Sequence, residues 1–351
     1  MRLTYLHIHN FKSIRSMEIR DIDRALIFVG KNNTGKTSIL DAVCAVCGCY
    51  EIQARDFNEN RQAIRIDACF SIEEEDLHLF HHMGIVSQYR RYDVWRRVFS
   101  ERLPSFKDGE LSFTLHVNQD GKVRYEDLYR KNNPYIHMVM PRIYRINAER
   151  ELNQLQNDLL MFQEDEELRR LRSGSCIFER AKKCNHCFQC IGLINQKKPE
   201  ELSAFETARL LEFKIYQLNL IGFSRKVNEN FFKNGGYEEI QYTLNFDADQ
   251  LFTVEVTAHN RQRGSVKPVE LMGKGMRSIY MLSLLETYIS EQGRIPSIIV
   301  VEDPEIFLHP QLQKSCSEIL YRLSKKNQVI FKTHSPDLLF NFSIRQIRQV
   351  V

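Results

Sequence analysis

The segment Gly30-Lys-Asn-Asn-Thr-Gly-Lys-Thr-Ser38 constrains the fold of this chain more than any other part of the sequence. It fits the pattern G-x-x-x-x-G-K-[ST]. The apolar run Ala25–Val29 before it is typical of a buried strand, and a helix is expected from Lys36 to about Cys47. A strand, a glycine-rich loop and a helix in this order cradle phosphate, because loop N–H groups and the helix N-terminus point at the anion. A chance glycine loop would lack this context.

The loop predicts a nucleoside triphosphate with Mg²⁺. The side chain of Lys36 is expected to reach the β- and γ-phosphates, and the hydroxyl of Thr37 is expected to bind the metal. The residues expected to contact the nucleotide from this loop are Gly30, Asn32, Asn33, Thr34, Gly35, Lys36, Thr37 and Ser38.

An acidic strand end is expected to complete the site. The apolar run Ile298–Val301 leads into Glu302 and Asp303, where Glu302 would bind Mg²⁺ and Asp303 would polarise the attacking water. The alternative is an acidic pair that only caps the next helix. The chain has no Asn-Lys dipeptide and no Asp-x-x-Gly segment, so a guanine-specific site is disfavoured and ATP is expected.

Strand-like runs alternate with helical ones along the chain, which predicts an α/β fold with a largely parallel central sheet. Further strands are expected at the following runs: Leu3–Phe11, Ile64–Ile72, Leu111–Val117, Ile143–Ile146, Ile240–Phe246, Leu251–Thr257 and Gln328–Lys332. The middle of the chain differs, because helical spacing from Leu152 to Phe162 and a second helix from Pro199, with a stripe from Ala204 to Leu218, predict an antiparallel helical hairpin.

Composition restricts the partners and the compartment. The 351 residues carry a net charge of +4, which is too mild to predict nucleic-acid binding from charge alone. No apolar stretch approaches the ~18 residues of a membrane span, and the N-terminus does not resemble a signal peptide. Nine cysteines without a secretion signal predict reduced thiols and a cytoplasmic protein that does not bind a membrane.

Four cysteines crowd into the turn between the two predicted helices. Cys176, Cys184, Cys187 and Cys190 are separated by seven, two and two residues. The overlapping Cys-x2-Cys-x2-Cys run is typical of ligands to a [4Fe–4S] cluster, whereas a zinc site is the equally weighted alternative, because His186 could substitute as a ligand. The alternative is that these cysteines are small buried residues of the hydrophobic core, and their close spacing disfavours it.

Several motifs occur in an order that resembles a known family. The motifs are Asn10-Phe-Lys-Ser-Ile14, the phosphate loop, Leu271-Met-Gly-Lys-Gly-Met-Arg-Ser278, Glu302-Asp-Pro-Glu305, Leu308-His-Pro310 and Thr333-His-Ser-Pro336. The chain thus resembles ATP-binding-cassette-type ATPases related to RecF and the structural-maintenance-of-chromosomes (SMC) proteins, and most closely the overcoming-lysogenisation-defect (OLD) endonucleases.

The resemblance implies further site residues and an assembly. Gly273 and Gly275 match the signature that contacts the γ-phosphate held by a partner subunit, His334 matches a switch histidine that senses the γ-phosphate, and Lys12 matches a basic residue near the nucleotide. Such a site closes around ATP in a homodimer. The departures include Glu302 where transport relatives have Asp, and Asp303 where the family has Glu, which predicts hydrolysis that is slow or needs reorganisation. The chain also ends at Val351, before the position of the family's Toprim nuclease domain.

These motifs predict an α/β P-loop ATPase interrupted by an insertion. Residues 1–150 form an N-terminal ATPase lobe, 151–233 a helical hairpin with a cysteine-rich metal-binding tip, and 234–351 a C-terminal ATPase lobe. The family implies ATP hydrolysis that drives a DNA transaction such as repair or antiviral defence, with duplex DNA and a nuclease or effector as candidate partners and no nuclease activity from this chain alone. The alternatives are a non-catalytic ATP-gated clamp or regulatory subunit, and a redox or damage sensor.

Overall fold

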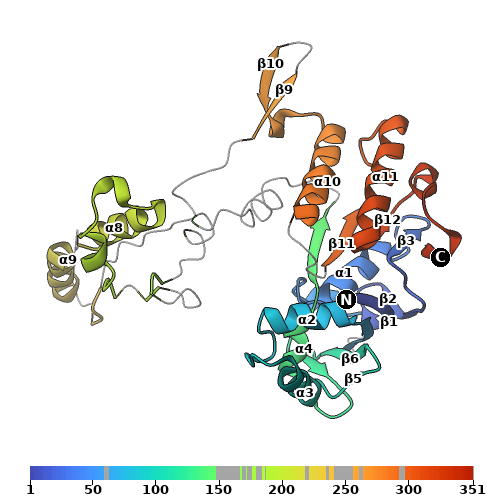
Figure 1. Ribbon diagram of the computed structural model, residues 1–351, viewed down its shortest axis with the longest axis horizontal. Helices are drawn as coiled ribbons and strands as arrows, with labels where there is room; N and C mark the ends of the chain where they lie inside the picture. The colour runs from blue at the N-terminus through green and yellow to red at the C-terminus, as the bar shows by residue number, and fades with distance from the viewer. Residues whose placement is uncertain are drawn as a thin grey trace. The chain divides into compact units, whose positions relative to one another are not determined.

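The computed structural model describes most of the chain, which forms two compact units (Figure 1). The first unit combines Met1–Gln156 with Ala258–Val351, and the second is Asn157–Thr257. The described residues are 1–58, 63–147, 167, 171, 176–178, 184–185, 187–217, 221–234, 237–240, 256–260, 264–291 and 297–350. The predicted boundaries at 150/151 and 233/234 differ from these divisions and stay predictions.

A five-stranded, fully parallel sheet forms the centre of the first unit. Its strands, in spatial order, are β13 (Ile347–Gln349), β3 (Ala25–Val29), β12 (Gln328–Lys332), β11 (Ser297–Glu302) and β8 (Arg142–Ile146). Every residue of β11 is buried, as expected for a parallel strand covered on both faces. The order places β12 between the strand before the phosphate loop and the strand that ends at Glu302. The predicted parallel α/β sheet is therefore confirmed.

A second, antiparallel sheet packs in the same unit. Its strands follow the order β2 (Ile14–Ile19), β1 (Arg2–Phe11), β4 (Ile64–Ser71), β6 (Glu110–Val117) and β5 (Phe106–Lys107), and β7 (Val123–Glu126) also pairs with β6. Burial alternates along β6, so one face is apolar and buried and the other is polar. The register shifts between Leu3 and Tyr5 of β1, which brings His7 opposite Asp67 and His9 opposite Arg65.

Helix α1 (Lys36–Val46) lies in one hydrophobic core with the two sheets. Ten of its eleven residues are buried, and it contacts both β1 and β12. The core includes Leu26 and Ile330 from the parallel sheet and Ile8 and Ile66 from the antiparallel sheet. Strand β12 is also contacted by α11 (Pro310–Lys326), and α11 contacts α10 (Lys274–Glu291). Because α1 is buried against strands of both sheets, the helix that carries Lys36 is held in place.

The described part of the first unit also contains shorter elements. They include the helices α2 (Glu74–His82), α3 (Tyr92–Arg102) and α4 (Pro134–Val139) and the 3-10 turns η1 (Ala54–Asp56), η4 (Val269–Leu271), η5 (Pro336–Leu339) and η6 (Ile344–Gln346). Strand β9 (Thr257–Asn260) pairs with β10 (Ser265–Pro268). No helix in the described ranges is long and apolar enough to cross a membrane.

The described part of the second unit is helical. It contains α7 (Ile191–Ile194), η2 (Pro199–Glu201), α8 (Ala204–Gln217) and α9 (Ile221–Lys233). The single helix predicted from Pro199 is wrong, because the backbone is extended at Leu202. The predicted stripe is also wrong: Ala204 and Leu211 are exposed, whereas Phe205 is buried. The ion pair between Arg209 and Glu212 lies on the same buried face as Phe205. A prediction based only on the spacing of apolar residues does not detect such a pair.

Some predictions fall outside the described residues. The first helix of the hairpin at Leu152–Phe162 lies there, as do most of the strands expected at Ile240–Phe246 and Leu251–Thr257. The helical hairpin therefore stays a prediction. The strands expected at Leu3–Phe11, Ile64–Ile72, Leu111–Val117, Ile143–Ile146 and Gln328–Lys332 are confirmed to within one or two residues at each end.

Candidate nucleotide-binding site

The phosphate loop leaves β3 and ends at the first turn of α1. Its opening glycine is required by close packing, because a Cβ on Gly30 would lie 2.2 Å from the carbonyl oxygen of Val350. The φ angle of Gly30 is +152°, a value that L residues rarely adopt. Thr34 Oγ1 donates to the carbonyl of Lys31 at 3.0 Å, and Asn32 and Asn33 are exposed. The loop is thus a turn with an open outer face.

Lys36 lies along this loop with only 5% of its surface exposed. Its Nζ donates to the carbonyl oxygens of Gly30, at 2.9 Å, and of Lys31. Burial and the nearby charge of Lys332 lower the pKa of Lys36, and Asp303 opposes that effect. A lysine in this position can transfer its donors from loop carbonyls to phosphate oxygens with a small side-chain movement.

Two carboxylates, one at the end of β11 and one directly after it, lie close to α1. Glu302 is 7% exposed at the end of the strand, and the backbone of Asp303 turns into the left-handed region, with φ +43°. The N–H of Asp303 donates to the carbonyl of Lys332 at 3.2 Å, which fixes the turn against the end of β12. Because positive φ is uncommon for residues other than glycine, the backbone at Asp303 is in a strained conformation.

Lys332, which was not among the predicted site residues, joins these groups. Its Nζ donates to Thr37 Oγ1 at 2.8 Å, and it lies 2.9 Å from Asp303 Oδ2 and 3.6 Å from Glu302 Oε2. The structure therefore brings Thr37, Glu302 and Asp303 together around one positive charge. The available signal was a charged residue at the end of the otherwise apolar strand Val329–Phe331.

A second set of ion pairs, also absent from the prediction, lies behind Glu302. Arg145 Nη2 is 2.6 Å from both Glu302 Oε1 and Asp41 Oδ1. Asp41, which is 3% exposed, also pairs with Lys12 Nζ at 2.5 Å. Burial alone would lower the pKa of Arg145, but the hydrogen bonds that it donates to Glu302 and the neighbouring negative charges raise it. An aspartate within the apolar run of α1 was the signal for this network.

The predicted residue Lys12 sits at the turn between β1 and β2. Its Nζ is 3.7 Å from Asp56 Oδ1 and 4.6 Å from the ring centre of Tyr50. Burial lowers its pKa, but the hydrogen bond with Asp41 outweighs it and the pKa of Lys12 is raised. Next to it, Ser13 Oγ lies 3.3 Å from Ser38 Oγ. Lys12 is therefore tied to α1 by charge.

His334 and the signature glycines lie on neighbouring segments. The backbone N–H of His334 donates to Glu305 Oε1 at 2.6 Å, and the residue is exposed. A Cβ on Gly275 would lie 2.5 Å from the carbonyl oxygen of Phe307, whereas a Cβ on Gly273 would meet nothing within 4 Å. The first turn of α10 therefore packs closely against the loop that follows Asp303.

The four clustered cysteines differ in exposure. Cys190 is buried, Cys176 and Cys184 are partly buried, and Cys187 is exposed. Burial raises the pKa of Cys190, and Cys184 and Cys187 add to this effect. Within the described residues, the group of three or more potential ligands that the structure brings within metal-binding distance is His7, His9 and Asp67, without any cysteine. The predicted cysteine metal site stays a prediction.

A phosphate loop at the end of a parallel strand, with acidic residues at the end of a nearby strand, defines this fold as that of a P-loop ATPase. The AAA ATPase domain family matches residues 1–339, and the chain belongs to that family. It carries an ATPase domain, which uses nucleotide and Mg²⁺.

Two curated relatives share parts of the sequence. The OLD nuclease of Thermus scotoductus is 30% identical over 78 residues, which are 22% of this chain and 15% of that protein. The Old nuclease of Escherichia phage P2 is 29% identical over 143 residues, 36% of this chain and 23% of the relative. The chain thus matches less than a quarter of the length of either relative.

Solved structures show the same fold at low sequence identity. An Smc head domain with an extended coiled coil from Pyrococcus furiosus, bound to the C-terminal domain of ScpA, has a TM-score of 0.53 at 15% identity, with 97% of this chain and 91% of that one covered. A second SmcHead, bound to the C-winged helix domain of ScpA, has a TM-score of 0.50 at 14% identity, with 100% and 98% covered. The predicted resemblance to SMC ATPases is confirmed at the level of the fold, and the resemblance to OLD nucleases is supported by sequence over part of the chain.

Proposed function

We propose that this chain binds ATP with Mg²⁺ at Gly30–Ser38 and hydrolyses it to ADP and phosphate. The observation that carries the proposal is the convergence of Thr37 Oγ1, Glu302 Oε2 and Asp303 Oδ2 on one positive charge, the ammonium of Lys332. Hydroxyl and carboxylate oxygens are the ligands that Mg²⁺ prefers, so these residues fit the ion. Thr37 and Glu302 would hold it, and bound Mg²⁺ would neutralise charge on the β- and γ-phosphates.

The remaining residues have distinct roles in this proposal. Lys36 donates to the β- and γ-phosphate oxygens in place of the carbonyls of Gly30 and Lys31. Asp303 orients a water whose oxygen forms a bond to the γ-phosphorus while the bond to the ADP oxygen breaks. The pair of Arg145 with Glu302 holds that carboxylate in position from behind.

ATP turnover in the parent chain and in Lys36→Ala tests this assignment. We expect turnover in the parent and none above background in the variant, because the variant lacks the donor for the developing phosphate charge. Lys326→Ala is the matched control, since it removes a lysine from the exposed end of α11. Equal turnover in Lys36→Ala and the parent would refute the site.

We further propose that ATP joins two copies of the chain. The first turn of α10, with Gly273 and Gly275, would contact the γ-phosphate held by the other copy, and His334 would sense that phosphate. The packing of Gly275 against Phe307 supports this, because it fixes the turn beside the loop after Asp303. An Asp303→Asn chain, expected to hold ATP longer, should elute as a dimer with ATP and as a monomer with ADP. A monomer with both nucleotides would contradict dimerisation.

The output that we propose is a DNA transaction in repair or antiviral defence, with duplex DNA and a nuclease or effector as partners. The partial match to two OLD nucleases supports this class of process. Turnover measured with and without duplex DNA tests the partner, and stimulation is expected. An unchanged rate over a range of DNA lengths would argue against DNA as the activator.

A non-catalytic or very slow ATP-gated clamp is the second candidate. The observation that favours it is the ion pair between Asp303 Oδ2 and Lys332 Nζ at 2.9 Å, which engages the carboxylate assigned to the attacking water. ATP-dependent dimerisation without turnover in the parent chain would favour the clamp over the hydrolase.

We also propose that Cys176, Cys184, Cys187 and Cys190 bind zinc or a [4Fe–4S] cluster. The electrostatic effect of Cys184 and Cys187 on Cys190 supports their proximity. Such a site would allow a sensor of redox state or damage. Brown protein with visible absorbance would indicate iron–sulfur, and colourless protein with one zinc would indicate zinc. The proposal would be refuted if protein purified without oxygen contained no metal and bound neither added zinc nor added iron with sulfide.

A further inference from the structure

The polar face of the antiparallel sheet carries a cluster that the nucleotide site does not use. His7 and His9 lie two residues apart on β1, so their side chains point to the same face. The register pairs His7 with Asp67 of β4 on one side and with Glu18 of β2 on the other. Two imidazoles and a carboxylate from two neighbouring strands are therefore held together by the sheet.

The distance between the two histidines matches that between two ligands of one metal ion, and the carboxylate lies slightly farther away. His9 Nε2 lies 3.2 Å from His7 Nδ1, and His7 Nδ1 lies 4.0 Å from Asp67 Oδ2. All three ligand atoms lie within 4.8 Å of one another. Two nitrogens bound at the usual zinc–nitrogen distance of about 2.0–2.1 Å, in a tetrahedron, are about 3.3 Å apart. The two histidines already have this separation, and a small rotation of partly exposed side chains would bring in the carboxylate.

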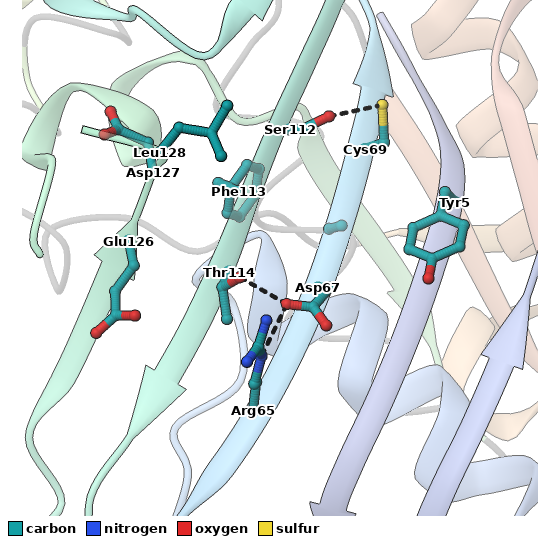
Figure 2. Close-up of a pocket in the computed structure, with 11 residues that line it drawn as sticks. Tyr5, Arg65, Asp67, Cys69, Ser112, Phe113, Thr114, Glu126, Asp127 and Leu128 are labelled. Atoms are coloured by element: carbon teal, nitrogen blue, oxygen red, sulfur yellow. Dashed lines mark hydrogen bonds and ion pairs between the residues drawn. The ribbon is translucent and has the colours of Figure 1, made fainter. Parts of the chain in front are cut away.

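A second layer of hydrogen bonds orients the three side chains. His7 Nε2 lies 3.2 Å from Ser16 Oγ, which leaves Nδ1 facing His9. Asp67 Oδ1 accepts from Arg65 Nε at 3.0 Å and from Thr114 Oγ1 at 2.6 Å (Figure 2). The pair with His7 therefore uses Oδ2. Metal-binding histidines and carboxylates usually have such outer partners, which fix their tautomer and direction.

We propose that His7, His9 and Asp67 form a binding site for a transition-metal dication of the zinc class. The donor set of two imidazoles and one carboxylate suits Zn²⁺ and leaves a fourth position open. Burial and the neighbouring His7 lower the pKa of His9, which is consistent with the neutral imidazole that a metal needs. The three residues are partly exposed, so an ion can enter from solvent.

A surface hollow beside Asp67 has room for a further ligand at the open coordination position of the metal. Asp67 also lines a hollow of about 410 Å³ on the same face, together with Tyr5, Cys69, Thr114 and Glu126 (Figure 2). An ion at the cluster would tie β1 to β4 just before the turn that carries Lys12. The site therefore combines a fixed donor set, an accessible coordination position and a mechanical link to the strand that leads to the nucleotide.

Zinc titration of the full chain tests the proposal, provided that the cysteines cannot bind the metal. A background variant with Cys176, Cys184, Cys187 and Cys190 all changed to Ser serves this purpose. Calorimetry should find one Zn²⁺ per chain in this background, and none after the further change His7→Gln with His9→Gln. His82→Gln is the matched control, because His82 is an exposed histidine of α2, and it should keep the single site.

Two results would overturn the proposal: no zinc bound by the cysteine-free background, or one zinc that survives loss of both histidines. Circular dichroism and thermal melting without zinc check that the variants fold. If the double histidine variant does not fold, zinc binding by Asp67→Asn tests the proposal instead. This variant should fold, because its amide oxygen can still accept hydrogen bonds from Arg65 and Thr114. It should weaken zinc binding by about tenfold or more. Unchanged zinc affinity in Asp67→Asn would show that the carboxylate is not a ligand, and this result would refute the proposed site.

Discussion

The ammonium nitrogen of Lys332 lies 2.8 Å from Thr37 Oγ1 and 2.9 Å from Asp303 Oδ2. These two oxygens come from different segments of the candidate site, one from the first turn of α1 and the other from the turn after β11. Lys332 therefore stands at the position proposed for Mg²⁺, and two cations cannot share it. The strand that ends in this lysine leads directly to Thr333 and His334, so movement of Lys332 would couple metal binding to the segment that carries the proposed switch histidine.

Lys332→Met should make Mg²⁺ bind more readily. The change removes a competing charge, so the Mg²⁺ concentration for half-maximal binding of a fluorescent ATP analogue should fall by about 3- to 10-fold, a difference of ~1 kcal/mol. Fluorescence titration of Mg²⁺ at fixed nucleotide measures it. Lys326→Met removes a lysine at the exposed end of α11 and should leave the midpoint unchanged. A higher Mg²⁺ requirement in Lys332→Met would mean that Lys332 assists the nucleotide instead.

Arg145→Met should destabilise the fold. Arg145 Nη2 is 2.6 Å from both Asp41 and Glu302, and its loss would leave two nearly buried carboxylates side by side. Removal of one partner from a buried ion pair costs about 3–5 kcal/mol, and the partial exposure of Arg145 reduces our expectation to about 2–4 kcal/mol in the free energy of unfolding. Urea denaturation measures this quantity.

The control for this prediction is an exposed ion pair of similar geometry. Arg322 contacts Glu286 through two nitrogens, at 2.6 and 3.0 Å, and is 54% exposed. Surface pairs contribute ~1 kcal/mol or less, so Arg322→Met should have a much smaller effect. If the two variants were equally stable, the network behind Glu302 would have no special energetic role.

The sequence predicted the parts of this site that depend on local pattern, and missed the parts that depend on strand order. Lys36, Thr37 and Glu302 belong to segments whose glycine spacing or apolar run is visible in the chain. Lys332 and Arg145 become site residues only because β12 and β8 flank β11 in the sheet. The local sequence does not determine that order, since the apolar pattern of each strand is compatible with other positions in a parallel sheet.

The same distinction explains the error in α8. Its predicted apolar stripe counted alanines and leucines at helical spacing, but the buried face holds Phe205 and the ion pair of Arg209 with Glu212. Charged residues are rarely buried without a partner, and a one-dimensional pattern does not show that the partner lies three residues along the same helix.

Alkaline pH should destabilise the chain partly through Tyr125. Burial, with smaller contributions from Cys47 and Cys49, raises its pKa to about 12, from an ordinary value of 10.0. Between these two values the unfolded chain has lost the proton and the folded chain keeps it, so stability falls as pH rises. The slope is about 1.4 kcal/mol per pH unit in that window and is absent below it.

Tyr125→Phe isolates this contribution. It removes the hydrogen bond to the carbonyl of Val46, at 3.3 Å, which should cost ~1 kcal/mol at pH 8. Between pH 9 and 11, unfolding by urea should then show a shallower loss of stability in the variant than in the parent. Parallel curves would show that Tyr125 ionises equally in the folded and unfolded chains.

The signature glycines offer a pair of matched variants, because they differ in local packing. A Cβ on Gly275 would lie 2.5 Å from the carbonyl oxygen of Phe307, and one on Gly273 would meet nothing within 4 Å. Alanine gains about 1 kcal/mol over glycine inside a helix, but overpacking costs about 1–3 kcal/mol, so Gly275→Ala should lower the free energy of unfolding by up to ~2 kcal/mol. Gly273→Ala should stay within about 0.5 kcal/mol of the parent.

The effect on ATP separates the local packing from the proposed contact between two copies. Gly275→Ala shifts the turn after Asp303 within one chain, so it should weaken turnover and lower stability together. Gly273→Ala leaves the single chain intact, and a methyl group there should interfere only where the first turn of α10 approaches a phosphate held by another copy. We expect it to bind the ATP analogue normally and to lose ATP-dependent dimerisation, measured by light scattering. A Gly273→Ala chain that dimerises like the parent would place the contact between copies elsewhere.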